Sequence, residues 1–249
     1  MKTKTTTKKS HSETDCNLIN AGIDIIVNDE SKLGVRSREI DVLADNVRLR
    51  NTVAKLKQTI KHRNLSAISA VQIGDEWEFE DNIRGEIVKE TCPPRVFCIK
   101  FGDTIRTFID PIITSASGLS LSREKCSCYP DREFLRVRNN DITLTFMSPT
   151  NKVESTHLVG KAAFVAQHQI DHLDGITLPL VGLEIFEDFD QATEEERQSI
   201  IDMYLESLDL RLKNLNKEIE EDEILSKTAN AIKFMEKVQK GEIELDINK

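Results

Sequence analysis

Phe164-Val-Ala-Gln-His-Gln-Ile-Asp-His-Leu-Asp-Gly175 is the stretch that decides the fold. Its imidazoles, His168 and His172, lie four residues apart, so on a helix they share one face and can converge on one metal ion. Metallohydrolases with the pattern His-Glu-x-x-His place a proton-transferring glutamate directly after the first ligand. This chain has Gln169 at that position. The stretch therefore predicts a helix that presents two metal ligands but lacks the usual base.

A third protein ligand is needed, because two imidazoles do not by themselves complete a metal site. Upstream, Cys126 falls in a predicted tight turn between strands, and a thiolate binds the same borderline metals as imidazole. Cys128 competes for that role, and the residues alone leave both sulfurs open. The candidates downstream of the helix are carboxylates at spacings that favour none of them: Asp174, Glu184 and Glu187.

Composition and charge narrow the class of protein. The chain of 249 residues carries a net charge of −9, which argues against broad nucleic-acid binding, although residues 1–9 are locally basic. No apolar run approaches the ~18 residues that span a bilayer, and no apolar segment follows the basic start as in a signal peptide. We therefore expect a soluble, cytoplasmic protein with no membrane partner and no direct contact with nucleic acid.

The cysteines are few, scattered and odd in number, in a chain too large to need disulfides for stability. We expect reduced thiols, of which one serves as a metal ligand. The five are Cys16, Cys92, Cys98, Cys126 and Cys128.

The order of predicted elements indicates an α+β fold, since strands precede a central helix without alternating β-α units. Helical periodicity runs from Ile40 to Lys61, where apolar residues recur at steps of four and three. Predicted strands cover 23–27, 96–101, 104–109, 134–137 and 142–146, with Gly102-Asp103 as a hairpin turn. The central helix covers 161–172 and stops at Gly175.

Three parts of the chain differ in character. Residues 1–19 are predicted to be a flexible polar N-terminus. Residues 20–186 form the predicted metal-binding domain, in which the acidic residues 75–95 are an inserted surface loop. Residues 187–249 are predicted to be a charged helical extension, which either docks on its own domain or dimerises as a short coiled coil. Its apolar stripe is Ile201, Leu205, Leu208, Leu212, Leu215 and Ile219.

Three ordered motifs of this chain resemble those of the peptide deformylases. Leu65 to Gly74 resembles Gly-x-Gly-Leu-Ala-Ala-x-Gln-x-Gly, and Glu124-Lys-Cys-Ser-Cys128 resembles Glu-Gly-Cys-Leu-Ser. Gln167 to Gly175 resembles Gln-His-Glu-x-Asp-His-Leu-x-Gly, the most specific of the three. The resemblance covers roughly residues 20–186. It implies a central metal-binding helix surrounded by antiparallel sheets, with Cys126 as the third ligand beside His168 and His172.

The resemblance also implies an activity, the removal of the formyl group from the N-formyl-methionine of nascent peptides. The metal would be Fe(II), with Zn(II) or Ni(II) as substitutes. Gln72 would hydrogen-bond the formyl oxygen or the metal's water, and the backbone N–H of Ser127 would complete an oxyanion hole. Bacterial members reach the ribosome through a C-terminal helix, whereas the acidic tail here disfavours contact with ribosomal RNA.

The departures from the family pattern bear on catalysis. Gln169 cannot exchange a proton near neutral pH, and general acid–base help is worth ~10²–10⁴-fold. Smaller departures are Ala67, Ser69, Lys125 and Cys128. Two hypotheses follow: a deformylase impaired at residue 169, or a catalytically silent module that binds metal and peptide. Next to the ligands, we expect Asp171 to pair with Arg138 and to orient the site.

Overall fold

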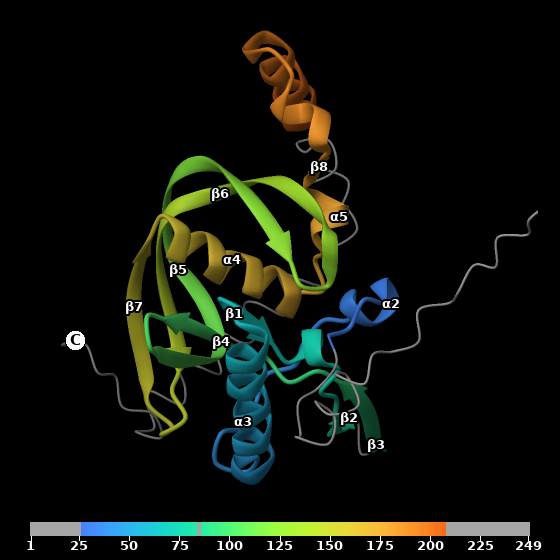
Figure 1. The fold of residues 1–249 in the computed structure, drawn as a ribbon. Helices are drawn as coiled ribbons and strands as arrows, with labels where there is room; N and C mark the ends of the chain where they lie inside the picture. Colours follow the sequence, from blue (N-terminus) through green and yellow to red (C-terminus); the bar gives the residue numbers. More distant parts are fainter. Residues whose placement is uncertain (1–25, 84–85, 208–249) are drawn as a thin grey trace, which may run out of the picture.

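An antiparallel β-sheet wraps around one helix and carries a second helix on its outside (Figure 1). The computed structural model describes residues 26–83 and 86–207. The six-stranded sheet has the order β1-β4-β5-β6-β7, and β8 pairs with β6. Its strands are β1 (Ala67–Ser69), β4 (Val96–Phe101), β5 (Thr104–Cys126), β6 (Tyr129–Met147), β7 (Val153–Val159) and β8 (Leu183–Ile185). The predicted α+β class is confirmed.

Apart from the helical residues 194–207, the helices of the described residues are short except for two. The long ones are α3 (Asn46–Arg63) and α4 (Lys161–Leu173). The others are α2 (Glu30–Leu33), α5 (Leu178–Val181) and two 3-10 turns, η1 (Val71–Ile73) and η2 (Glu187–Asp190). The predicted central helix is therefore present within one residue of its expected end. The predicted helix from Ile40 instead begins at Asn46, since Ile40 and Val42 are buried in the irregular segment that precedes it.

Strands β5 and β6 form one long hairpin that arches over α4 (Figure 1). Its register runs from the pair Ile109↔Met147 to the pair Cys126↔Tyr129, with irregularities that bend the strands. The sequence predicts two separate strands at 134–137 and 142–146, but β6 continues through the polar residues between them. Pairing with β5 overrides the turn-like composition there, because ladder contacts outweigh local propensity.

Helix α4 is held in the middle of the fold by small residues on its buried face. Ala163 and Ala166 are fully buried and bring the helix close to the sheet. Leu173, at the end of the helix, is buried in the same cluster. The strand residues in that cluster include Phe97, Phe108, Ile142, Leu144, Phe146 and Leu158. The helix is thereby fixed against four strands, which fixes the direction of the side chains on its other face.

Residues 75–95, which the sequence predicts to be a surface loop, contain a two-stranded antiparallel hairpin. Its strands are β2 (Trp77–Ile83) and β3 (Glu86–Cys92). Trp77 is buried under the guanidinium of Arg48, which lies 5.1 Å from the ring centroid. The exposed face of the hairpin carries acidic residues, which obscure the alternation of apolar and polar residues in the sequence. Glu78 and Glu80 on this face both pair with Lys89 of the neighbouring strand. The loop prediction is therefore corrected to a hairpin.

The chain ends are described only in part. The N-terminal segment 1–19 lies outside the described residues, and Ile26 and Val27 are not in a strand. In the extension, residues 194–207 are helical, and the Tyr204 hydroxyl donates to the Val181 carbonyl at 2.9 Å. This part of the extension therefore contacts the domain, while Leu205 remains 42% exposed. The other members of the stripe after Leu205, which are Leu208, Leu212, Leu215 and Ile219, lie outside the described residues. No helix of the described ranges is long and apolar enough to cross a membrane.

Candidate metal centre

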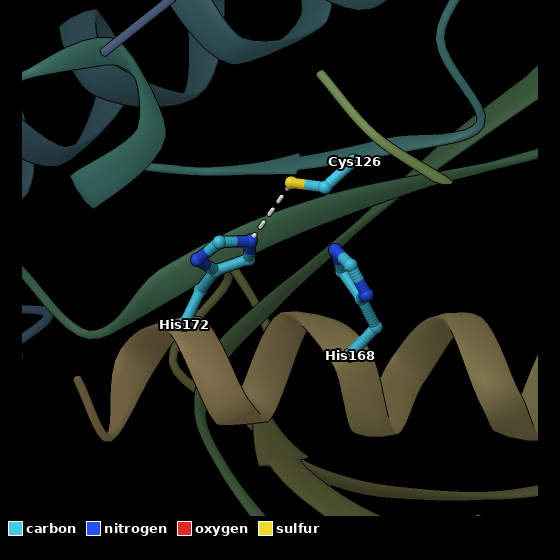
Figure 2. Close-up of side chains that lie close together, drawn as sticks. All are labelled: Cys126, His168 and His172. Carbon is cyan, nitrogen blue, oxygen red and sulfur yellow. Dashed lines mark hydrogen bonds between the residues drawn. The ribbon is translucent and has the colours of Figure 1, made fainter. Parts of the chain in front are cut away.

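Cys126, His168 and His172 meet at the inner face of the β5–β6 hairpin (Figure 2). One ligand atom from each lies within 4.8 Å of the other two, and Cys126 Sγ is 3.3 Å from His172 Nε2. Cys126 ends β5, whereas both histidines project from one face of α4. Within residues 26–83 and 86–207 this is the only such group of three potential ligands. The predicted trio is therefore brought together from segments more than forty residues apart.

Glu124 orients one of the two imidazoles. Its Oε2 lies 2.8 Å from His168 Nδ1, so the other ring nitrogen of His168 faces the thiol. Glu124 also accepts two hydrogen bonds from Arg138, at 2.7 and 3.0 Å. Arg138 in turn donates to Asp171, which is the pairing that the sequence predicts. A buried chain of charges thus runs from Asp171 to His168.

The pKa values in this chain follow from burial and pairing. Burial raises the pKa of Glu124, but hydrogen bonds from Arg138 and His168 outweigh it and lower the pKa to about 2. Burial lowers the pKa of His168, but hydrogen bonds to Cys126 and Glu124 raise it to about 9. Glu124 is therefore a fixed negative charge behind the imidazole. Sequence reasoning passed over this role, although strand alternation places Glu124 and Cys126 on the same face of β5.

The donor set fits a divalent metal. A thiol and two imidazoles are the ligands that Zn(II) and Fe(II) accept in tetrahedral sites, and three protein ligands leave one position for a substrate or water. Both histidines turn a ring nitrogen toward the Cys126 sulfur, and a carboxylate holds the far nitrogen of His168, as is usual for metal-binding histidines. The protein side of the site is already arranged for a metal ion.

Two of the three carboxylates considered as downstream ligands, Asp174 and Glu184, are engaged elsewhere. Asp174 accepts from Arg95 at 2.6 Å, and Glu184 pairs with Arg132 through two hydrogen bonds of 2.7 Å. The side chain of Glu187 is outside the described residues. Cys128 lies next to the trio but is not among the ligand atoms that come within 4.8 Å of one another. Cys126 is thus the third member of the group.

Gln72 reaches the site from η1 with a defined orientation. Its Oε1 accepts hydrogen bonds from the backbone N–H of Ser69 at 2.9 Å and from the Ser69 hydroxyl at 3.1 Å. The amide nitrogen therefore points the other way, toward the sulfurs of Cys126 at 3.6 Å and Cys128 at 3.5 Å. Gln72 acts here as a hydrogen-bond donor directed into the site.

A cleft of about 760 Å³ opens onto these residues. The site residues predicted from the sequence that line it are Gln72, Cys126, Ser127, His168 and Gln169; His172 lies behind them. Gln169 is 3% exposed, and its buried Oε1 has no hydrogen-bond partner in the described part of the chain. An unsatisfied buried amide costs free energy, so a donor on a bound ligand stabilises it. The cleft thus offers donors and one acceptor around the candidate metal centre.

The comparisons agree with this geometry. A family model described as polypeptide deformylase matches residues 23–179. A peptide deformylase of Dictyoglomus turgidum is 23% identical over 146 residues, which are 59% of this chain and 83% of that protein. One of Orientia tsutsugamushi is 31% identical over 71 residues, or 28% of this chain and only 39% of that protein.

Solved structures give the same fold. The peptide deformylase of Thermotoga maritima superimposes with a TM-score of 0.53 at 21% identity, covering 63% of this chain and 95% of that one. The enzyme of the Vibrio parahaemolyticus bacteriophage VP16T, solved with actinonin, gives a TM-score of 0.51 at 21% identity, with 62% and 99% covered. At these identities the structural likeness establishes the fold alone.

Proposed function

Because the chain belongs to the polypeptide deformylase family, whose members are metal-dependent hydrolases, we propose that it removes the N-formyl group from formyl-methionyl peptides, slowly. The observation that carries the proposal is the meeting of Cys126, His168 and His172 beside a cleft of about 760 Å³. Nascent chains are the proposed source of substrate, and N-terminal methionine processing is the proposed role. The free thiols of the described residues suit a reducing, cytoplasmic location.

Cys126, His168 and His172 would hold one divalent metal, Fe(II) in the proposal, with Zn(II) or Ni(II) as substitutes. When bound, such a metal polarises a carbonyl oxygen and makes water a better nucleophile at neutral pH. Glu124 keeps His168 in the required tautomer, because its carboxylate accepts the Nδ1 proton at 2.8 Å.

The chain itself supplies donors for the charge that develops on the formyl oxygen. Gln72 Nε2 already points into the site, since Ser69 occupies its Oε1. Ser127 lies in the two-residue turn that joins β5 to β6, at the wall of the cleft. Its backbone N–H is the second proposed donor. Preorganised donors of this kind stabilise a transition state without reorganisation, and losing one costs ~10²–10³-fold in rate.

Gln169 sets the limit on turnover. It stands where a glutamate would take a proton from water and deliver it to the leaving amine, and an amide can do neither. We therefore propose an activity lower by ~10²–10⁴-fold than that of a site with a carboxylate there. The binding and orienting parts of the site do not depend on that proton transfer.

A second candidate function rests on the same glutamine. The Gln169 side chain is 3% exposed and its unpartnered oxygen can accept a hydrogen bond from the N–H of an intact formamide. A silent module that binds formyl-peptides and metal without hydrolysing them would use this contact. The extension beyond residue 187 would then connect the module to partners. The Tyr204 hydroxyl of this extension bonds the Val181 carbonyl of the domain, and this docking favours a monomer over a tail-mediated dimer.

Formate release decides between the two candidates. The protein, loaded anaerobically with Ni(II) or Fe(II), is given formyl-Met-Ala-Ser, and formate is measured against a metal-only control and a Cys126→Ala variant. The enzyme hypothesis expects release above both controls. Release equal to the controls, together with saturable binding of the formyl-peptide, would favour the silent module. If the protein shows no formate release and no binding of the formyl-peptide, both candidate functions are excluded.

A further inference from the structure

Cys128 is a buried thiol for which the proposed function has no use. It is 2% exposed, and it occupies the second position of the turn between β5 and β6, two residues after Cys126. Both sulfurs lie near the same amide nitrogen, that of Gln72, at 3.5 Å for Cys128 and 3.6 Å for Cys126. The Gln72 amide nitrogen therefore lies within hydrogen-bond reach of both sulfurs. A second sulfur thus lies beside the same amide as the one sulfur that belongs to the candidate metal centre.

We propose that Cys126 and Cys128 form a reversible disulfide on exposure to peroxide, and that this disulfide withdraws Cys126 from the metal centre. Chain geometry permits the bond, because Cα atoms two residues apart are separated by at most about 7 Å and by less in a turn. Disulfides span Cα separations of roughly 4.4–6.8 Å. Both sulfurs already lie within 3.6 Å of the Gln72 amide nitrogen, so they face the same small region.

The chemistry balances with peroxide as the oxidant. The Cys126 sulfur attacks one peroxide oxygen, the O–O bond breaks, and a sulfenic acid and one water form. The Cys128 sulfur then attacks the Cys126 sulfur, the S–O bond breaks, and the disulfide and a second water form. Two thiols are oxidised and one peroxide is reduced. A dithiol such as dithiothreitol reverses the reaction by thiol–disulfide exchange.

Access and burial favour this pair over the other thiols of the described residues. Cys126 lines the open cleft, so a small oxidant can reach it. Cys92 is buried at the end of β3, and Cys98 is buried in the core, where its thiol contacts the Thr107 hydroxyl. Neither borders the cleft. The effect on metal binding rests on the proposed function, whereas the disulfide itself does not.

Peptide mapping tests the disulfide directly. Trypsin cleaves after Lys125 and Arg132, so both sulfurs fall in the single peptide Cys126-Ser-Cys-Tyr-Pro-Asp-Arg132, while Cys92 and Cys98 fall in two others. After peroxide treatment, denaturation and alkylation, we expect this peptide to be unalkylated and lighter than its reduced form by two hydrogens. The peptides with Cys92 and Cys98 should be alkylated. A sulfinic or sulfonic Cys126 beside an alkylated Cys128 would overturn the proposal.

Reversibility of zinc loss tests the link to the metal centre. Zn(II)-loaded wild type, Cys128→Ser and the control Cys92→Ser are oxidised, and then treated with dithiothreitol and Zn(II). Wild type and Cys92→Ser should recover their zinc. Cys128→Ser should not, because its Cys126 lacks a partner thiol and proceeds to irreversible oxidation. Equal recovery by all three contradicts the proposal. If reduced wild type binds no zinc, the proposed function fails, and the peptide map still decides whether the disulfide forms.

Discussion

Glu124 Oε2 lies 2.8 Å from His168 Nδ1, and this contact decides which nitrogen of the imidazole faces the cleft. The carboxylate is itself fixed by Arg138, whose guanidinium is 3% exposed and bonds both of its oxygens. The position of a candidate metal ligand on α4 therefore depends on a charged pair contributed by β5 and β6.

Replacing this carboxylate should weaken metal binding. For Glu124→Gln we expect a Zn(II) affinity about 10–100-fold below that of wild type, because the amide no longer holds the His168 ring in its ligating tautomer. Competition with a chromophoric chelator, at a temperature where both proteins are folded, measures the change. Glu133→Gln is the matched control, since Glu133 lies on the same hairpin but pairs with Arg123. A Zn(II) affinity equal to that of the control would show that Glu124 has no role in metal binding.

Restoring a carboxylate at residue 169 should accelerate turnover. Gln169→Glu is expected to raise formate release by at least ~10-fold, because the side chain regains a group that can carry a proton. Gln169→Ala is the companion variant, and its rate should not exceed that of wild type. Both should bind as much metal as wild type. A Gln169→Glu rate unchanged from wild type would move the defect to Ala67 or Lys125, the other departures at the cleft wall.

Gly175 closes α4 at a point where no side chain fits. Its φ is +71°, and a Cβ there would come within 2.4 Å of the Gly34 carbonyl oxygen. Gly175→Ala should therefore lower the free energy of unfolding by at least about 3 kcal/mol, from left-handed strain and the backbone clash together. Gly102→Ala has a similar φ of +57° but open space around it, so it should cost only about 1 kcal/mol. Urea unfolding compares the two, and equal losses would refute the clash.

Cys98 should make the fold sensitive to alkali. Burial raises the pKa of its thiol from 9.0 to about 11. Since the folded pKa exceeds the unfolded one, the stabilisation is complete below pH 9.0 and is lost as the pH rises through about 11. The loss amounts to about 3 kcal/mol at about 1.4 kcal/mol per pKa unit. Between these pH values, Cys98→Ala should lose less stability than wild type. Urea unfolding at several pH values measures the free energy of unfolding of both proteins. An equal fall with pH in wild type and Cys98→Ala would contradict the prediction.

Local patterns predicted the parts of the fold whose partners are near in sequence. The stripe through Leu49, Val53, Leu56 and Ile60 is buried on α3 as expected, and the Gly102-Asp103 turn joins β4 to β5. The hairpin β2–β3 escaped prediction because its exposed face is acidic, and the pairing of Lys89 with Glu78 and Glu80 joins residues of two different strands.

The candidate site likewise has parts that local sequence patterns predict and parts that they do not. The shared face of His168 and His172 follows from helical spacing alone, whereas the choice between two nearby sulfurs does not. Cys126 and Cys128 both lie beside Gln72, and only the end of β5 turns Cys126 toward the imidazoles. The contact between Glu124 and His168 joins residues forty-four positions apart. Such pairings depend on how the hairpin lies over α4, which no local pattern encodes.

Metal content per chain tests the central claim most directly. Wild type, Cys126→Ala and His172→Ala are reconstituted with Zn(II), freed of excess metal and analysed by atomic emission, with Cys92→Ala as a buried-thiol control. We expect about one metal per chain for wild type and the control, and a large loss for Cys126→Ala and His172→Ala. Wild type that holds no zinc, or ligand variants that hold as much as wild type, would contradict this expectation.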